Sequence, residues 1–127
     1  MDEMHFKKIA IKLAVETINE ELNMEILDIE KLIAIKPAVL VYFYNDACAP
    51  CKVLRPKVQE MIETHFPKMV FQLVNTEQFS GAAAHFGVFA SPTLLVFFEG
   101  KEYIRESKNI SISELHDKIE RIYGMVF

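Results

Sequence analysis

The chain has 127 residues, of which 51% are hydrophobic and 25% are charged. This length suits one domain that buries about two thirds of the surface its unfolded chain exposes, and the composition is that of a globular protein rather than a disordered or fibrous one. The formal net charge is -4, and lysines and glutamates are mixed along the chain without a basic block. A nucleic-acid partner is therefore not expected.

The first twenty residues do not have the features of a targeting segment. The longest apolar runs between their charges have three residues, as in residues 9–11, whereas a secretory signal has a longer run. Glutamates at 16, 20 and 21 argue against an acid-poor mitochondrial transit peptide. No stretch has the length needed to cross a bilayer. We therefore expect a cytoplasmic protein that does not associate with membranes.

The chain has two cysteines, and both lie in the run Cys48-Ala49-Pro50-Cys51. Secreted scaffolds usually carry several cysteines scattered along the chain, where they join distant segments. A single, closely spaced pair indicates site chemistry rather than a structural staple.

The N-terminal part of the chain predicts two helices with a short strand between them. Apolar side chains recur at helical spacing over residues 5–22, and we expect this helix to pack on the domain rather than to serve as a partner-binding arm. Residues 24–27 are predicted as a short strand, and Asp28 as the N-cap of a helix that ends near Ile35. Pro37 marks the turn that follows. Residues 1–23 are thus predicted as a helical extension of a domain formed by residues 24–127.

The middle of the chain predicts a βαβ unit. Residues 39–44 are a continuous apolar run, which is typical of a central strand buried on both faces of a sheet with parallel strands. Apolar residues at helical intervals follow over residues 53–66, and residues 69–74 are a second strand candidate. The crossover between the two strands is expected to be right-handed.

A short helix and a β-hairpin are predicted next. Residues 78–86 form the helix, which Gly87 closes in a left-handed conformation. Residues 94–98 are a third buried strand. Gly100 lies in a tight turn, from which residues 102–106 return as an antiparallel edge strand.

The last predicted helix begins with a capping-box pattern formed by Ser111 and Glu114, ahead of apolar residues at helical spacing. Gly124 is expected just past its end. Together, the elements give the order βαβ, helix, β-hairpin, helix, which belongs to the α/β class.

The position of the cysteine pair suits thiol chemistry. The pair lies between the first buried strand and the helix after it, where free N–H groups and the positive end of the helix dipole stabilise a thiolate. Cys48 is therefore the predicted nucleophile. Cys51, one helical turn further on, is placed to attack the mixed disulfide that Cys48 forms with a substrate. Pro50 suits an early helical position.

Zinc binding is the main chemical alternative, because zinc sites use the same cysteine spacing. A tetrahedral site needs two further ligands, and His65, His85 and His116 include no pair at the spacing of a zinc motif. We therefore expect no metal and no cofactor other than the redox-active Cys48–Cys51 pair itself.

Two segments of the chain resemble the thioredoxin family. Residues 39–52 follow that family's strand and active-site motif, and Pro56 falls where family members carry a helix-kinking proline. Residues 91–101 resemble the segment with the family's cis-proline and hairpin. The resemblance covers about residues 24–124. It implies a thioredoxin-like three-layer α/β/α fold with a central mixed β-sheet, to which the N-terminal helix is an addition.

The resemblance also implies a function: a protein thiol-disulfide oxidoreductase, and more specifically a disulfide reductase in cell redox homeostasis and electron transport. By resemblance, Pro92 is a cis-proline that faces the cysteines, and the backbone of Ser91 pairs with an extended substrate peptide. The implied substrate surface is mostly uncharged: Ala47, Ala49, Pro50, Ala90, Ser91, Pro92. The expected partners are protein disulfides, with a thioredoxin-reductase-like protein or a low-molecular-weight thiol as electron donor. The expected working form is a monomer.

Around the cysteines the chain departs from the family pattern. Ala47 stands where the family has a tryptophan, which reduces substrate contact, and Ala49 stands where it has a glycine. The residues between the cysteines thus supply no positive charge, and Asp46 opposes a thiolate at Cys48. We therefore expect a reducing rather than an oxidising potential.

A second departure lies behind the cysteines. Tyr42 takes the place of the family's buried aspartate and Leu73 that of the lysine usually paired with it, so the family's proton shuttle is missing. We expect slow release of the mixed disulfide as a result. The alternative function is a binding module of the same fold whose cysteine pair is a redox switch with little turnover.

Overall fold

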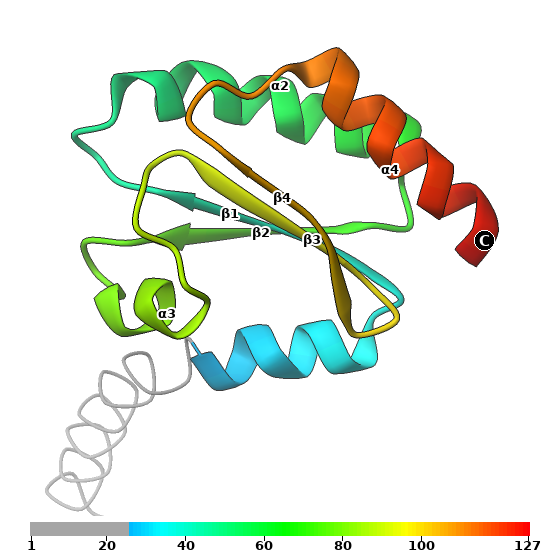
Figure 1. Cartoon of the computed structure of the whole chain (residues 1–127), viewed down its shortest axis with the longest axis horizontal. Helices are drawn as coiled ribbons and strands as arrows, with labels where there is room; N and C mark the ends of the chain where they lie inside the picture. Colours follow the sequence, from blue (N-terminus) through cyan, green and yellow to red (C-terminus); the bar gives the residue numbers. More distant parts are fainter. Residues whose placement is uncertain (1–25) are drawn as a thin grey trace, which may run out of the picture.

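One mixed β-sheet of four strands forms the centre of the computed structural model, which describes residues 26–127 (Figure 1). Residues 26–35 are helical and precede the sheet. The later elements are β1 (Ala38–Tyr44), α2 (Ala49–His65), β2 (Val70–Asn75), α3 (Ser80–His85), β3 (Thr93–Phe98), β4 (Lys101–Ser107) and α4 (Ile112–Val126).

The sheet has the order β2-β1-β3-β4, with β1 parallel to β2 and antiparallel to β3, and with β3 antiparallel to β4. Helices α2 and α4 cover one face of this sheet, while α3 and the helical residues 26–35 lie on the other face (Figure 1). The predicted three-layer α/β/α arrangement with a mixed sheet is therefore confirmed.

Strand β1 is the predicted inner strand. Its first six residues are buried, because strands flank it on both edges and helices cover both of its faces. Val39 and Val41 belong to the core cluster under α3, whereas Leu40 and Tyr42 belong to the cluster under α2 and α4. Both alternating faces are thus apolar, which explains the continuous apolar run in the sequence.

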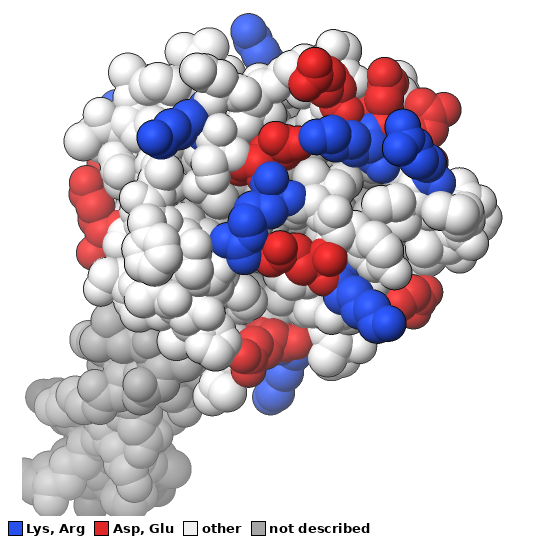
Figure 2. Space-filling model, in the orientation of Figure 1, with Lys and Arg blue, Asp and Glu red and all other residues white. Residues whose placement is uncertain are grey.

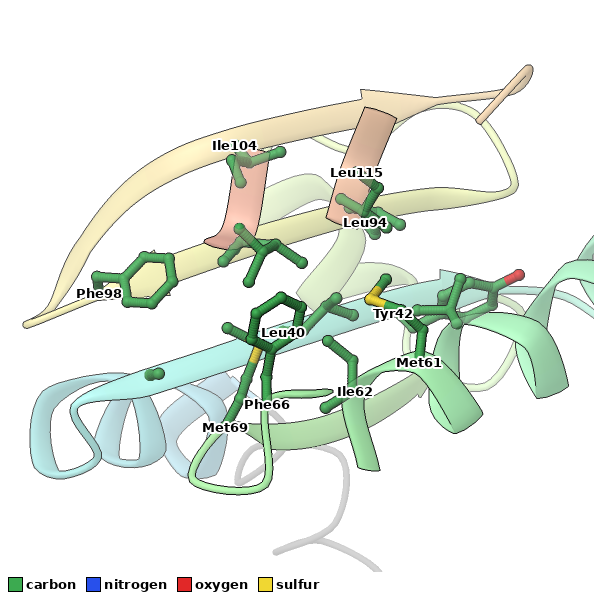
Figure 3. Close-up of a cluster of buried hydrophobic side chains, with 14 residues drawn as sticks. Leu40, Tyr42, Met61, Ile62, Phe66, Met69, Leu94, Phe98, Ile104 and Leu115 are labelled. Atoms are coloured by element: carbon green, nitrogen blue, oxygen red, sulfur yellow. The ribbon is translucent and has the colours of Figure 1, made fainter. Parts of the chain in front are cut away.

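The core between the sheet and helices α2 and α4 anchors the helix that carries the cysteines (Figure 3). Met61 and Ile62 of α2 lie in one cluster with Leu40 of β1, Leu94 of β3 and Leu115 of α4. Burying such side chains contributes about 1.5–3 kcal/mol each. The C-terminal half of α2 is therefore held firmly, and this fixes where its N-terminal turn stands at the end of β1.

Most predicted elements agree with the structure to within a few residues. Helix α2 begins at Ala49 with Cys48 as its N-cap, so the predicted position of the cysteine pair at the start of this helix is confirmed. Gly87 and Gly100 have positive φ angles of 67° and 82°, as their predicted positions in a helix end and a hairpin turn require. The side chain of Ser111 accepts a hydrogen bond from the backbone N–H of Glu114, so the predicted N-cap of α4 is also confirmed.

The prediction for residues 24–27 is wrong for the two residues that the structure describes, because residues 26 and 27 are helical. Asp28 consequently lies inside the helix and is not its N-cap. The physical reason is the spacing of Ile29 and Ile33, which are both buried against the sheet, with Ile26 packed beside them. The predicted end at Ile35 is confirmed, while the helix predicted over residues 5–22 lies outside the described residues.

The prediction that α4 ends before Gly124 is also wrong, since the helix continues to Val126. Tyr123 and Val126 both pack against the core, and the backbone N–H of Phe127 donates to the carbonyl of Tyr123. These contacts outweigh the weak helix propensity of one glycine. None of the helices within residues 26–127 has the length and apolar character needed to span a membrane.

Candidate active site

Cys48 is the N-cap residue of α2, in the short connection that follows β1. Its backbone N–H donates to the carbonyl of Asn45 at 3.2 Å, and its Sγ accepts a hydrogen bond from the backbone N–H of Cys51, also at 3.2 Å. Pro50 lies in the first turn of the helix, which has no acidic side chain. The sulfur of Cys48 thus faces the positive end of the helix dipole with a backbone donor aimed at it, an arrangement that stabilises a thiolate.

Cys48 and Cys51 form a disulfide, with their Cα atoms 5.3 Å apart. The two residues differ in exposure, because Cys48 is half-buried while only 1% of Cys51 is exposed. An external thiol or disulfide therefore has access to the Cys48 side of the bond. Cys51 lies behind it, bonded to the Cys48 sulfur and shielded from solvent.

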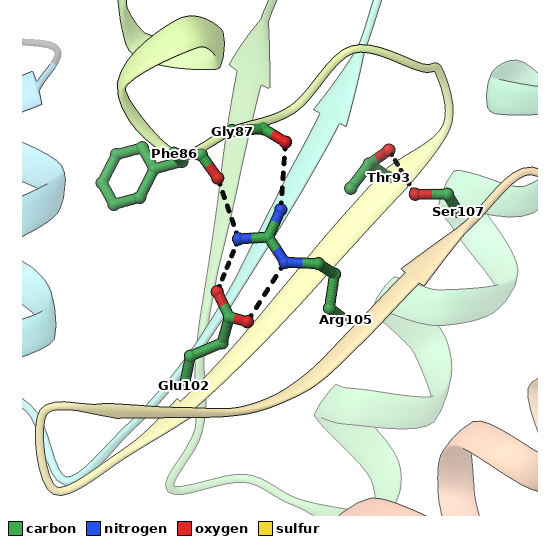
Figure 4. Close-up of polar contacts among 6 residues, drawn as sticks. All are labelled: Phe86, Gly87, Thr93, Glu102, Arg105 and Ser107. Carbon is green, nitrogen blue, oxygen red and sulfur yellow. Dashed lines mark hydrogen bonds and ion pairs between the residues drawn. The ribbon is translucent and has the colours of Figure 1, made fainter.

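The loop before β3 has the predicted cis peptide bond between Ser91 and Pro92. Pro92 is buried, and the hydroxyl of Thr93 donates to the carbonyl of Ala90 at 2.7 Å. Because that bond uses the only hydrogen of the Thr93 hydroxyl, the contact of 2.9 Å to the Ser107 hydroxyl has Ser107 as donor (Figure 4). The loop is thereby tied across its own bend and to strand β4.

The structure brings the cysteine segment and the proline loop together in part. Pro50 and Pro92 line one groove of about 420 Å³. Ala90 and Ser91 line a second hollow of about 230 Å³ with Asn45, whose backbone holds Cys48. Two further residues of the predicted substrate surface are exposed: Ala47, Ala49.

Tyr42 stands behind the cysteines, as expected from its place in β1. It is fully buried, and its hydroxyl donates to the backbone carbonyl of Cys51 at 3.1 Å. Leu73 is its direct neighbour in β2, so the two residues that depart from the family pattern pair across the sheet. Burial raises the pKa of Tyr42 to about 12, an effect that the positive charge of Arg55 partly offsets. The phenol therefore stays protonated at neutral pH and is not a base for Cys51.

Arg105 of β4 clamps the chain that leads from α3 to the proline loop (Figure 4). Its guanidinium donates to the carbonyl oxygens of Phe86 and Gly87, at 2.8 Å and 3.2 Å. Glu102 holds the other side of the guanidinium through two contacts of 2.7 Å and 3.1 Å. The hydrogen bond with Glu102 is the main reason why the pKa of Arg105 is raised, so the clamp keeps its charge.

Sequence reasoning missed three positioning contacts around the site. The bond from Thr93 to Ala90 could have been predicted, because the two residues are only three apart and Thr93 follows Pro92 directly. The bonds from Arg105 to the carbonyls of Phe86 and Gly87 could not have been predicted, because these partners are distant in sequence. The same is true of the bond from Asn75 to Asp46. The side-chain amide of Asn75 donates to the carboxylate of Asp46 at 3.4 Å, which holds that acid in the connection before Cys48.

The histidines of the described residues have other partners. His65 ends α2, at the opposite end from Cys48, and a helix of 17 residues is about 25 Å long. The rings of His65 and His116 lie edge to face with their centroids 5.0 Å apart, so His116 is also at the end of α2 opposite the cysteines. His116 contacts Asp117 and Glu120 on α4, and His85 contacts Glu30 at 2.6 Å.

Comparison with known proteins places this arrangement in a family. The family model described as Thioredoxin matches residues 13–121. The chain is 26% identical over 100 residues to thioredoxin-like protein YdfQ of Bacillus subtilis, an alignment that covers 79% of this chain and 88% of the relative. It is 37% identical over 78 residues to mitochondrial thioredoxin-2 of Schizosaccharomyces pombe, covering 61% of this chain and 58% of that protein.

Solved structures give the same result. Thioredoxin from Fasciola hepatica superposes with a TM-score of 0.67 at 34% identity, covering 75% of this chain and 91% of the other. A thioredoxin from Plasmodium falciparum superposes with a TM-score of 0.67 at 26% identity, covering 75% and 91% of the two chains. The match spans most of the sequence and includes the disulfide at the start of α2. The chain therefore belongs to the thioredoxin family of thiol-disulfide oxidoreductases.

Proposed function

We propose that the chain reduces protein disulfides, with Cys48 as nucleophile and Cys51 as resolving cysteine. The observation that carries this proposal is the difference between the two sulfurs. Cys48 is accessible and caps α2, whereas Cys51 is buried behind it and donates its backbone N–H to the Cys48 sulfur. Substrates can therefore reach the sulfur of Cys48, while the buried sulfur of Cys51 is placed to attack Cys48.

The reaction has two exchanges. The Cys48 thiolate attacks one sulfur of the substrate disulfide, a mixed disulfide forms, and the other substrate sulfur leaves as a thiolate. Cys51, once deprotonated, attacks Sγ of Cys48 and releases the second substrate sulfur as a thiolate. Two electrons pass to the substrate, and the Cys48–Cys51 disulfide that the structure contains is the product on the protein.

The substrate surface that we propose is uncharged and shallow, and it consists of Ala47, Ala49, Pro50, Ala90, Ser91, Pro92. Ser91 and Ala90 are half-buried beside an open hollow, which leaves room for an extended peptide to pair with the Ser91 backbone. Such pairing is independent of side chains, so it suits varied protein disulfides.

The electron donor in this proposal is a thioredoxin-reductase-like protein or a low-molecular-weight thiol, and the protein works as a monomer in the cytoplasm. A chain whose two cysteines form one redox pair suits a reducing compartment. On the face shown in Figure 2, acidic and basic side chains alternate rather than gather in a basic patch. This distribution supports protein partners over nucleic acid.

Reduction of insulin by dithiothreitol tests the proposal. We expect the protein to accelerate insulin precipitation severalfold or more, and the Cys48→Ser variant to leave it at the uncatalysed rate. If the unaltered protein is also without effect, the cysteine pair is a redox switch and the proposed turnover is wrong.

A further inference from the structure

A groove beside the cysteine pair carries positive charge that the reduction chemistry does not use. It lies between the start of α2, the proline loop and the connection from β4 to α4, and Pro50 and Pro92 both line it. We call it the lysine groove; the lining residues used below are Pro50, Val53, Leu54, Lys57, Pro92, Lys108.

The lysine groove has an apolar wall next to the reactive bond. Val53 is 61% exposed although it lies only two residues after Cys51, and Leu54 lines the groove beside it. A single exposed valine is ordinary on a protein surface. Here, however, the valine lines a recess of about 420 Å³ together with Pro50, which is also exposed, and with Leu54, which is only partly buried.

The two lysines come from different elements. Lys57 belongs to α2, whereas Lys108 follows β4. Neither forms an ion pair with an acidic side chain of the described residues. In a chain with a net charge of -4, this is a local concentration of positive charge beside the site.

The backbone at Lys108 gives a second, independent observation. Its N–H donates to the carbonyl of Pro92 at 2.8 Å, so the residue is held directly against the proline loop. Its φ angle is +64°, a left-handed conformation that glycine adopts freely and that a lysine adopts only at a cost in energy. Such a conformation persists only where the surrounding structure holds it, and here the hydrogen bond to Pro92 fixes the place of Lys108 at the edge of the groove.

We propose that the lysine groove selects protein substrates that carry an acidic residue close to the reactive cysteine. The apolar wall at Val53 receives a neighbouring aliphatic side chain, while Lys57 and Lys108 attract the carboxylate. This inference rests on the proposed reductase function and adds to it a preference among substrates.

The test uses peptides that carry one cysteine joined to thionitrobenzoate as a mixed disulfide. Three peptides differ only at one position near the cysteine, which is Glu, Gln or Lys. When Cys48 attacks the peptide sulfur, the bond to thionitrobenzoate breaks and the coloured thiolate leaves, so stopped-flow absorbance gives the rate constant of the attack. We expect a rate constant about three- to tenfold higher for the Glu peptide than for the Gln peptide, and lowest for the Lys peptide.

Two variants assign the effect to the groove. Lys108→Gly removes one charge and suits the left-handed backbone, and Lys57→Gln removes the other charge. We expect each to reduce the ratio of the Glu to the Gln rate constant, and the double variant to bring it to about one. Lys101→Gln is the matched control: this exposed lysine lies at the hairpin, at the other end of the sheet, and its removal should keep the unaltered ratio.

The outcomes separate the inference from the function on which it rests. Equal rate constants for the Glu and Gln peptides, with fast release from both, would overturn the charge preference and leave the reductase intact. A preference that survives in the double variant would also overturn the assignment to the groove. Release no faster than with the Cys48→Ser variant, for all peptides, would instead contradict the proposed function itself.

Discussion

Cys48 and Cys51 have different environments although only two residues separate them. The N-terminal position of Cys48 on α2 and its partial exposure suit attack on an external disulfide. Cys51 is in the first turn of the helix, where it is enclosed by the core and by Tyr42. The asymmetry predicts that the two cysteines fail in different ways when each is replaced.

Replacing Cys51 with serine should leave the first exchange intact and remove the second, so that mixed disulfides with client proteins accumulate. Replacing Cys48 should prevent both exchanges. The measurement is non-reducing electrophoresis of each variant after incubation with disulfide-containing proteins, followed by mass spectrometry of the adducts. Equal trapping by the two variants would contradict the assignment of roles.

Tyr42 has a consequence for stability at high pH. Its pKa rises from 10.0 in the unfolded chain to about 12 in the folded protein because burial disfavours the phenolate. Above pH 10 the unfolded chain loses this proton while the folded protein keeps it, so the free energy of unfolding falls as the pH rises toward 12. The loss is at most about 1.4 kcal/mol per pH unit.

In the Tyr42→Phe variant this part of the fall in the free energy of unfolding should be absent, because phenylalanine has no proton to lose. Urea unfolding at several pH values between about 9 and 12 compares it with the unaltered protein, and the other tyrosines cancel since both proteins contain them. Parallel curves over this interval would show that Tyr42 ionises equally well in both states.

The missing carboxylate behind Cys51 predicts a slow second exchange. A buried thiol ionises with difficulty, and the Tyr42 phenol cannot take its proton at neutral pH. Tyr42→Asp should speed the decay of the mixed disulfide at neutral pH, though by less than the ~100-fold of an ideally placed general base, because packing is lost. Single-turnover decay measures the rate, with Tyr42→Phe as the control. A folded Tyr42→Asp variant that decays no faster than the control would show that proton transfer is not limiting.

At the scale of elements, the loop before β3 depends on contacts from the strands rather than on its own residues. Thr93 ties the loop to itself and to Ser107, and Arg105 holds the start of the loop through the carbonyls of Phe86 and Gly87. These bonds fix the backbone of Ala90 and Ser91, which is the part of the loop that we assign to substrate pairing.

Thr93→Val should therefore weaken substrate reduction, because the carbonyl of Ala90 loses its donor. Because Ala90 is only partly buried, the cost in stability is below the ~1–3 kcal/mol of a fully buried unpaired acceptor. Thr93→Ser keeps the hydroxyl and loses only a methyl group, so both variants lose stability while only the valine variant should lose a large part of kcat/KM for insulin. Equal kcat/KM in the two variants would mean that the hydroxyl does not position the loop.

The elements also show where local sequence is informative. The run at residues 39–44 was predicted correctly because both faces of β1 are buried, a condition that leaves a clear pattern. The segment at residues 24–27 was not, because a short apolar run fits a strand or a helix equally well and the packing of Ile29 and Ile33 decides between them. Gly124 was misjudged for a similar reason, since core contacts beyond it extend α4.

For the whole molecule, the sequence was enough to predict a sheet covered by helices on both faces. It was also enough to place the cysteine pair at the start of the helix after the first strand. The predicted N-cap environment of Cys48 and the placement of Tyr42 opposite Leu73 both agree with the structure. The clamp at Arg105, the bond from Asn75 to Asp46 and the lysine groove could not be predicted, because each joins residues that only the tertiary fold brings together. The division into an extension of residues 1–23 and a domain of residues 24–127 stays a prediction.

In the proposed reaction, the reduced Cys48–Cys51 pair gives two electrons to a substrate disulfide and becomes a disulfide itself. The most direct test is a single turnover in which fully reduced protein is mixed with an equal amount of a disulfide substrate in the absence of any other thiol. Quenched samples are alkylated and weighed by mass spectrometry, which counts the thiols left on each partner. We expect the loss of both protein thiols, as an internal disulfide, to match the appearance of two substrate thiols over time. A protein that keeps both thiols while the substrate stays oxidised would contradict the account.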